Sequence, residues 1–244
     1  MKKINKNTYI RAAARKQLLG KYAACVFAYI ISDFILTTAS GLFRMQLDVS
    51  KLPQLFLYCL IQFIMLLLSG IFLTGQNYLY LNIARGRQYT YRDIWYGFMH
   101  LADRVIRIEL FITLHMIVRG IPFFIMAVIY LILGGKLLLS LNALLGVQFL
   151  INAVVLQITY SQSFFLILDK PDADLRQIME ASILLMNGNK LRYFKLIMSF
   201  LGMYILSLLT FGLGFLWVTP YYYSTRANFY LDLLRQRKER LREN

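Results

Sequence analysis

Long apolar runs separated by short, basic polar segments organise the whole chain. Four runs each exceed the roughly 20 apolar residues that an α-helix needs to cross the hydrocarbon of a bilayer, and the stretch 194–234 is too long for one crossing. Residues 210–214, Thr-Phe-Gly-Leu-Gly, predict a turn near the middle of that stretch. The pattern predicts one all-α integral membrane domain, 1–244, built as a polytopic helical bundle. Six spans are expected near 22–43, 54–83, 108–133, 137–168, 194–211 and 213–234.

Several features break or connect these runs. Gly120 and Pro122 are expected to interrupt the third span. The sixth span would contain Pro220 and a row of tyrosines, which is polar for a helix that faces lipid. Two connecting segments, 90–101 and 173–187, place apolar residues at helical spacing, and Gly188 is a natural stop for the second. They are expected to be amphipathic helices, lying either on the membrane surface or against neighbouring parts of the protein.

Both ends of the chain are basic. Residues 1–21 contain seven Lys or Arg residues and no Asp or Glu, and 235–244 forms a basic tail. Arg11 and Arg15 are four residues apart and so share one face of a helix expected over 9–19. We expect this helix to lie at the interface, held against anionic lipid by its charges; the alternative is apolar insertion through Tyr9, Ile10 and Leu18.

The composition agrees with a membrane protein, and the distribution of charge predicts which side of the membrane each loop occupies. The chain is 59% hydrophobic and 16% charged, with a formal charge of +15. Of its 27 Lys and Arg residues, seven fall in 1–21, five in 85–107, five in 170–195 and six in 226–242. Because basic loops stay in the cytoplasm, six spans with both termini cytoplasmic are expected, in the plasma membrane. Five spans would leave the basic tail outside. The interspersed charges argue against nucleic-acid binding.

Polar residues inside the expected spans are candidate site residues, because each costs free energy in hydrocarbon. Each of two spans presents an uncharged polar stripe on one face. The stripes are Gln62, Ser69, Gln76 and Tyr80, and Gln148, Asn152, Thr159 and Gln162. They either hold helices together by hydrogen bonds or line a polar cavity. Asp33 and Arg119 lie roughly midway along their runs, and mutual pairing would lower the cost of burying each charge.

Catalytic and cofactor chemistry has little support in the residues. Cys25, Cys59, His100 and His115 do not form a metal-ligand pattern. No Ser-His-Asp arrangement, phosphate-binding loop or zinc-protease helix occurs in the sequence. An enzyme acting on lipid would rest only on Asp33, Glu109 and His115. We therefore expect no catalytic residues, no cofactor and no metal site.

The C-terminal hairpin resembles a known family. The residues that carry the resemblance are Ser182–Lys190, Phe194, Ser199–Gly202, Gly212–Trp217, Pro220-Tyr221 and Ala227–Tyr230, with Arg11, Ala14-Arg15, Leu18, Gly20, Ala84–Gly86 and 91–98 towards the N-terminus. The chain resembles bacterial membrane proteins of the domain-of-unknown-function 975 family, common in Gram-positive bacteria. Met203 departs from the family pattern, which more often has Trp there. The resemblance implies a multi-spanning membrane protein and leaves its activity open.

Two functions follow as expectations. The first is a non-enzymatic protein with a structural, lipid-binding or accessory role in the cell envelope. Its partners would be membrane lipids, anionic at the cytoplasmic face, and a further membrane protein. The alternative is a small transporter or channel subunit with a polar intramembrane cavity, supported by the interrupted third span, the Gly-rich turn and the polar stripes.

Overall fold

The computed structural model describes residues 7–47 and 50–243, and these residues form helices and connecting turns only. The helices are α1 (Asn7–Leu18), α2 (Tyr22–Gln46), α3 (Leu52–Arg85), η1 (Tyr91–Trp95), η2 (Gly97–Leu101), α4 (Ala102–Leu133), α5 (Lys136–Tyr160), α6 (Ser163–Asp169), α7 (Leu175–Met186), α8 (Lys190–Leu209) and α9 (Phe215–Glu243). The predicted all-α class is confirmed for this part of the chain.

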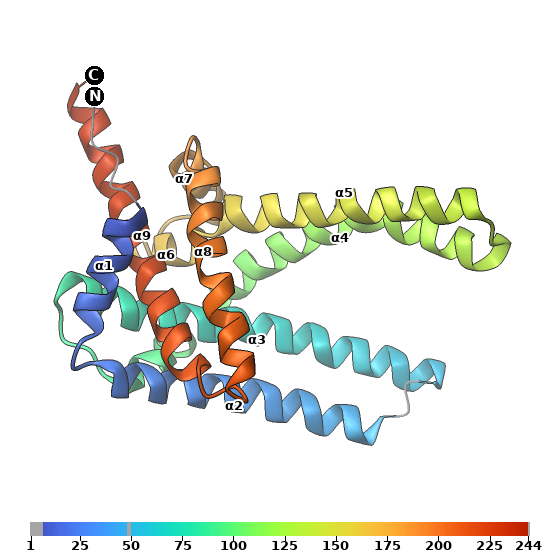
Figure 1. The fold of residues 1–244 in the computed structure, drawn as a ribbon, viewed down its shortest axis with the longest axis horizontal. Coiled ribbons are helices and arrows are strands. Elements are labelled where there is room, and N and C mark those ends of the chain that lie inside the picture. Colours follow the sequence, from blue (N-terminus) through green and yellow to red (C-terminus); the bar gives the residue numbers. More distant parts are fainter. Residues whose placement is uncertain (1–6, 48–49, 244) are drawn as a thin grey trace.

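Two long helical hairpins, α2–α3 and α4–α5, project from a compact base (Figure 1). Their outer parts are apolar and exposed, as at Phe56, Leu131 and Leu144, which are 73%, 80% and 65% exposed. Such surfaces are unstable in water and suit a lipid environment. Within the described residues, five helical segments are long and apolar enough to cross a membrane. They are Tyr22–Gln46, Leu52–Arg85, Tyr91–Leu133, Lys136–Asp169 and Lys190–Leu209.

The expected sixth span corresponds to α9, which is not one of these five segments. This helix lies in the base, where Ala227, Phe229 and Tyr230 are fully buried, and it packs against α1, α2, α3 and α8. Many of its polar and aromatic residues therefore contact protein. Contact with protein accommodates a segment that would be too polar for a lipid-facing helix. Together α8 and α9 form a hairpin that crosses the two long hairpins at a steep angle (Figure 1).

Two predicted helix ends are confirmed, and both use a glycine with positive φ. Helix α7 ends at Met186, and Gly188 follows with φ +75°. The predicted turn at 210–214 separates α8 from α9, with Gly212 at φ +87°. A residue without Cβ adopts this left-handed conformation at little cost. The C-terminal hairpin therefore turns where the sequence predicts it.

The predicted interruption of the third span is wrong. Helix α4 is continuous from Ala102 to Leu133 and contains Pro122. A proline in a membrane helix is tolerated where neighbouring groups compensate for the lost hydrogen bond. Gly120 serves packing instead, since a Cβ there would lie 2.9 Å from ring carbons of both Phe124 and Phe149. The fourth predicted span, in contrast, is divided at Ser161 and Gln162 into α5 and α6.

The amphipathic segments pack against the protein itself. In α1, Ile10, Ala14 and Leu18 are at most 2% exposed. In α7, Ile178 and Met186 are at most 1% exposed. The apolar contact with lipid that the alternative assigns to Ile10 and Leu18 is therefore made with protein. Tyr9, at 61% exposure, remains on the surface.

Candidate functional site

A polar pocket lies between α2, α3 and α9, within the part of the molecule that the sequence places at membrane depth. Its volume is about 230 Å³. Its lining residues are Tyr29, Ser32, Asp33, Leu36, Ser69, Phe72, Leu73, Gln76 and Tyr223. On α2 the polar residues fall at positions i, i+3 and i+4, so they share one helix face. Oxygen-bearing side chains from three helices therefore converge on one hollow.

Gln76 is a buried amide in this pocket. It is 6% exposed, and its Nε2 donates a hydrogen bond to Ser32 Oγ at 2.5 Å. The Ser32 hydroxyl in turn lies 3.0 Å from the carbonyl oxygens of Ala28 and Tyr29. Gln76 Oε1 has no hydrogen-bond partner among the described residues. A buried acceptor of this kind favours a donor group in the pocket, because an unsatisfied polar atom is costly.

Asp33 gives the pocket its negative charge. Its side chain also lines a second hollow, whose other side is formed by Phe211, Gly212 and Leu213 of the α8–α9 turn and by Phe215 and Leu216 of α9. None of the salt bridges found within residues 7–47 and 50–243 involves Asp33. The arrangement can hold a small cationic or hydrogen-bond-donating group. It contains no histidine, and no nucleophile is paired with a base.

The predicted polar stripes are only partly assembled into this site. From α3, Ser69 and Gln76 line the pocket, whereas Gln62 does not and Tyr80 is buried beside it, stacked on Tyr223 with ring centroids 5.6 Å apart. The α5–α6 stripe lies elsewhere. Its members Gln148, Asn152, Thr159 and Gln162 do not line this pocket.

The α5–α6 stripe is used locally instead. The Thr159 hydroxyl donates to Val155 O at 2.6 Å in its own helix, and Thr159 O accepts a hydrogen bond from Ser182 of α7 at 2.8 Å. Gln162 Nε2 donates to Ser161 Oγ at 2.8 Å. The side-chain hydrogen bonds of Thr159 and Gln162 are therefore local, and the contact between helices uses the backbone carbonyl of Thr159.

Asp33 and Arg119 lie on different hairpins, on α2 and α4. Both side chains are exposed, and no ion pair joins them in the portion of the chain that the structure describes. Their pairing stays a prediction from the sequence that this arrangement does not support.

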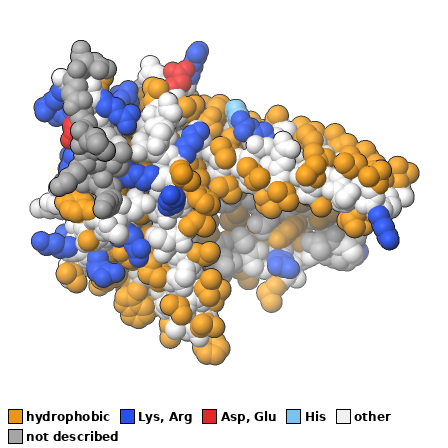
Figure 2. Space-filling view, turned by 45° about the horizontal axis from the view of Figure 1, so that its top comes forward, with side chains coloured by type: hydrophobic (Ala, Val, Ile, Leu, Met, Phe, Trp, Pro, Cys, Tyr) orange, Lys and Arg blue, Asp and Glu red, His pale blue; other side chains and the backbone are white. Residues whose placement is uncertain are grey.

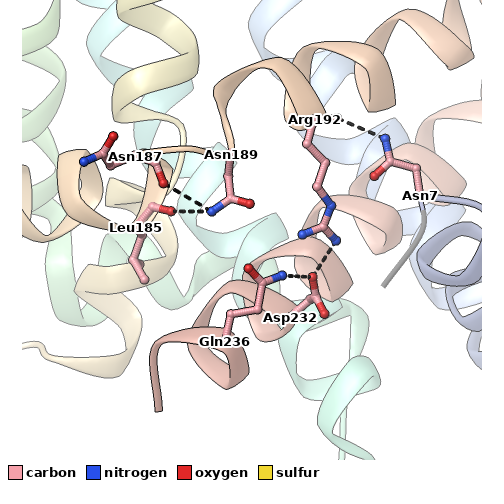
Figure 3. Close-up of polar contacts among 7 residues, drawn as sticks. All are labelled: Asn7, Leu185, Asn187, Asn189, Arg192, Asp232 and Gln236. Carbon is pink, nitrogen blue, oxygen red and sulfur yellow. Dashed lines mark hydrogen bonds and ion pairs between the residues drawn. The ribbon is translucent and has the colours of Figure 1, made fainter. Parts of the chain in front are cut away.

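The base contains polar contacts that the sequence patterns did not reveal. Arg192 of α8 contacts Asp232 of α9 at 2.5 Å, and Gln236 donates to the same carboxylate at 2.8 Å (Figure 3). Asn7 of α1 donates to Arg192 O at 3.0 Å, which ties the start of the described chain to the same place. Asp232 is the acidic residue inside the last apolar stretch. It was the sequence feature that could have predicted this contact, because an isolated carboxylate there needs a partner.

Arg226 is a second unpredicted feature of the base. It is 9% exposed, and its Nε donates to the Tyr193 hydroxyl at 3.1 Å. Its guanidinium lies 5.6 to 5.9 Å from the ring centroids of Phe165, Tyr222 and Tyr223. Ring faces attract a cation at such distances. The tyrosine row of α9 therefore surrounds a buried charge rather than facing lipid.

Charge is segregated over the surface. Exposed Lys and Arg side chains gather on the base, while hydrophobic side chains cover the projecting hairpin (Figure 2). The exposed basic residues of the base are Arg15, Lys16, Arg87, Arg92, Arg107, Lys170, Arg176, Lys195, Arg235, Arg237, Lys238, Arg240 and Arg242. We call this set the basic rim. Among the described residues outside this set, the hairpins carry four exposed basic residues, Arg44, Lys51 and Lys136 near their tips and Arg119 along α4.

Comparison with known proteins agrees with the resemblance seen in the sequence. Residues 1–238 match the family described as Protein of unknown function (DUF975). No curated protein and no solved structure matches the chain. Because the family match extends over almost all of the sequence, the chain belongs to the DUF975 family.

Proposed function

We propose that this protein is a non-enzymatic membrane protein of the cell envelope that binds anionic lipid along its base and has a structural or accessory role there. The observation that carries the proposal is the segregation of the basic rim from the apolar hairpins. Each Lys or Arg near an anionic leaflet contributes roughly 1 kcal/mol of attraction. A set of this size on one side of the apolar surface favours one orientation and one class of lipid.

The base is proposed to sit at the cytoplasmic leaflet of the plasma membrane. The packing of α1 against α9 supports this orientation, because it brings both ends of the described chain to the same base. The positive-inside rule then assigns that side to the cytoplasm. Insertion of the hairpins α2–α3 and α4–α5 places their tips outside.

A structural role fits the use of the charged groups in the base. Arg85 pairs with Asp169, and Arg192 pairs with Asp232, so these charges join helices to one another. A membrane-protein partner would contact the exposed apolar flanks of the hairpins. The pairings use the two carboxylates in packing rather than leaving them available for acid–base chemistry.

The proposal is tested by the lipid that the full-length protein selects. The protein is reconstituted into vesicles of equimolar phosphatidylglycerol and phosphatidylcholine, extracted in mild detergent, and its co-purified phospholipids are quantified by mass spectrometry. We expect phosphatidylglycerol to be enriched several-fold, and the enrichment to fall at high salt because salt screens surface charge. Equal recovery of the two lipids at low salt contradicts the proposal.

A second candidate function, binding of a small cationic solute by a transporter or channel subunit, is favoured by the pocket at Asp33 and Gln76. Sodium, potassium and tetramethylammonium chloride serve as probes. This function predicts that one of them raises the melting temperature of the wild type and leaves Asp33→Asn unchanged. A matched control is Asp93→Asn, which lies in η1 outside the pocket. The same shift in all three proteins rejects a site at Asp33.

A further inference from the structure

An apolar groove runs between α5 and α8, where the second hairpin meets the base. Its volume is about 460 Å³, within the roughly 300–1,000 Å³ typical of ligand sites. Its lining residues are Leu150, Ile151, Val154, Val155 and Ile158 of α5, with Lys190, Leu191 and Phe194 of α8. The α5 residues follow the i, i+1, i+4, i+5, i+8 spacing of one continuous helix face. The groove is therefore an elongated apolar trough rather than a round cavity.

Lys190 is the one charged residue among those that line the groove. It is the first residue of α8. The turn before it is held by Asn189, whose Nδ2 lies 3.3 Å from Leu185 O and 3.4 Å from Asn187 O (Figure 3). Arg192, two residues later, is directed to Asp232 of α9 instead. Of the two basic residues in the first turn of α8, Arg192 thus contacts α9 in the base and Lys190 lines the groove.

The ammonium group of Lys190 is available to an anion. None of the salt bridges found within 7–47 and 50–243 involves it, and no Asp or Glu is among the groove residues. By the charge distribution of the sequence, Lys190 also lies at the inner end of an expected span. The groove therefore has one apolar wall along α5 and one positive end near the membrane surface.

We propose that this groove binds one anionic phospholipid, with an acyl chain along the α5 face and the headgroup phosphate at Lys190. The inference rests on the proposed function and assigns it a site. An acyl chain fills the trough by burial of apolar area, which is favourable by about 0.8 kcal/mol per CH₂ when the alternative is water. In a bilayer that term is small, so the charge of Lys190 supplies the selectivity: it attracts a headgroup of net negative charge, whereas the trimethylammonium group of phosphatidylcholine offsets the attraction of its phosphate.

A phospholipid suits the groove better than a protein segment does. An apolar helix laid into it would cover Lys190 without providing an anion, and burying an unpaired charge is unfavourable. A lipid has an apolar chain and an anionic group joined at one end, in the same order as the groove. Charge complementarity therefore selects the lipid.

The test uses the full-length protein and two matched pairs of variants. Lys190→Gln removes the positive end, and its control Lys136→Gln neutralises an exposed lysine at a hairpin tip that neither lines the groove nor belongs to the basic rim. Val154→Trp fills the trough, and its control Val147→Trp places the same ring at a position on α5 that is 56% exposed and does not line the groove. Native mass spectrometry counts phosphatidylglycerol and phosphatidylcholine bound to each purified protein.

We expect Lys190→Gln and Val154→Trp each to reduce bound phosphatidylglycerol at least threefold, and both controls to bind as the wild type does. Lys190→Arg is expected to keep binding, because it retains the positive charge that Lys190→Gln removes. If the wild type itself does not prefer phosphatidylglycerol, the proposed function fails. If it does, and both groove variants behave like their controls, only the groove assignment is wrong.

Two further outcomes also overturn the assignment. A loss in Val154→Trp with none in Lys190→Gln shows that a chain is seated without recognition of an anionic group. A change from dimer to monomer in Val154→Trp, with lipid binding intact, shows that a second copy of the chain occupies the groove.

Discussion

Arg85 and Asp169 form a two-pronged ion pair that joins the end of α3 to the end of α6. Nη1 lies 2.7 Å from Oδ1, and Nη2 lies 2.7 Å from Oδ2. The Tyr230 hydroxyl of α9 donates to the same carboxylate at 2.8 Å. One carboxylate therefore connects three helices, which are α3 of the first hairpin, α6 after the second hairpin, and the C-terminal helix α9.

Loss of this carboxylate is predicted to destabilise the base. Asp169→Asn leaves the Arg85 guanidinium without its counter-charge, and hydrogen bonds to charged groups contribute about 1.5–3 kcal/mol each. We expect the free energy of unfolding in micelles to fall by about 2–3 kcal/mol, and by about 1 kcal/mol for Tyr230→Phe, which removes one hydrogen bond.

The control for this prediction is the Arg176–Glu180 pair on the surface of α7, at 2.7 Å. Exposed pairs contribute little to stability, so Glu180→Gln should unfold as the wild type does. An Asp169→Asn protein as stable as the Glu180→Gln control would show that the three-helix contact does not support the base.

Gly75 is predicted to be indispensable for the packing of η1 on α3. A Cβ at this position would lie 1.8 Å from the carbonyl oxygen of Ile94, which is backbone and cannot rotate away. Gly75→Ala should therefore separate the two elements and lower the yield of monodisperse protein on size-exclusion chromatography.

The matched variant is Gly202→Ala in α8, where no neighbouring atom lies within 4 Å of the added Cβ. Alanine favours a helix over glycine by about 0.8–1 kcal/mol, so this change should be neutral or stabilising. Equal behaviour of the two variants would contradict the close approach of Gly75 to Ile94.

Asp33 and Arg119 provide a direct test of two arrangements. The sequence predicts an ion pair, in which the double variant Asp33→Asn/Arg119→Gln recovers stability lost by either single change. The structure places them on separate hairpins, so their effects should add within about 0.3–0.5 kcal/mol. Unfolding of the four proteins in one detergent gives the coupling energy. Coupling well above that range would support the pair and reject the separation seen here.

The sequence predicts local features of this fold better than its assembly. The turn at 210–214 and the stop at Gly188 depend on neighbouring residues only, and both are found where predicted. The expected sixth span depended on the positive-inside rule, which places the basic tail in the cytoplasm only if the stretch 194–234 crosses the membrane twice. Periodicity cannot distinguish a helix buried in protein from one buried in lipid, and the tyrosines around Arg226 show that α9 is of the first kind.

The same limit applies to the polar site. Helical spacing correctly places Ser69 and Gln76 on one face of α3, and both line the pocket. Spacing within a helix does not show which other helix that face meets. Gln76 donates to Ser32 of α2 and shares its pocket with Tyr223 of α9, and the stripe on α5 lies elsewhere. Lys190 was counted only as a loop charge, because its groove exists only where α5 and α8 meet.

The most direct test of the account compares lipid selection by three full-length proteins in equimolar phosphatidylglycerol and phosphatidylcholine. One is the wild type, one carries Arg15→Gln, Lys16→Gln, Arg235→Gln and Arg237→Gln in the basic rim, and one carries Lys136→Gln at a hairpin tip. The quantity measured is the ratio of the two lipids that co-purify. We expect phosphatidylglycerol enrichment in the wild type and the tip variant, and a lower enrichment in the rim variant, which keeps nine residues of the basic rim and the Lys190 groove. The same ratio in all three proteins would contradict the account.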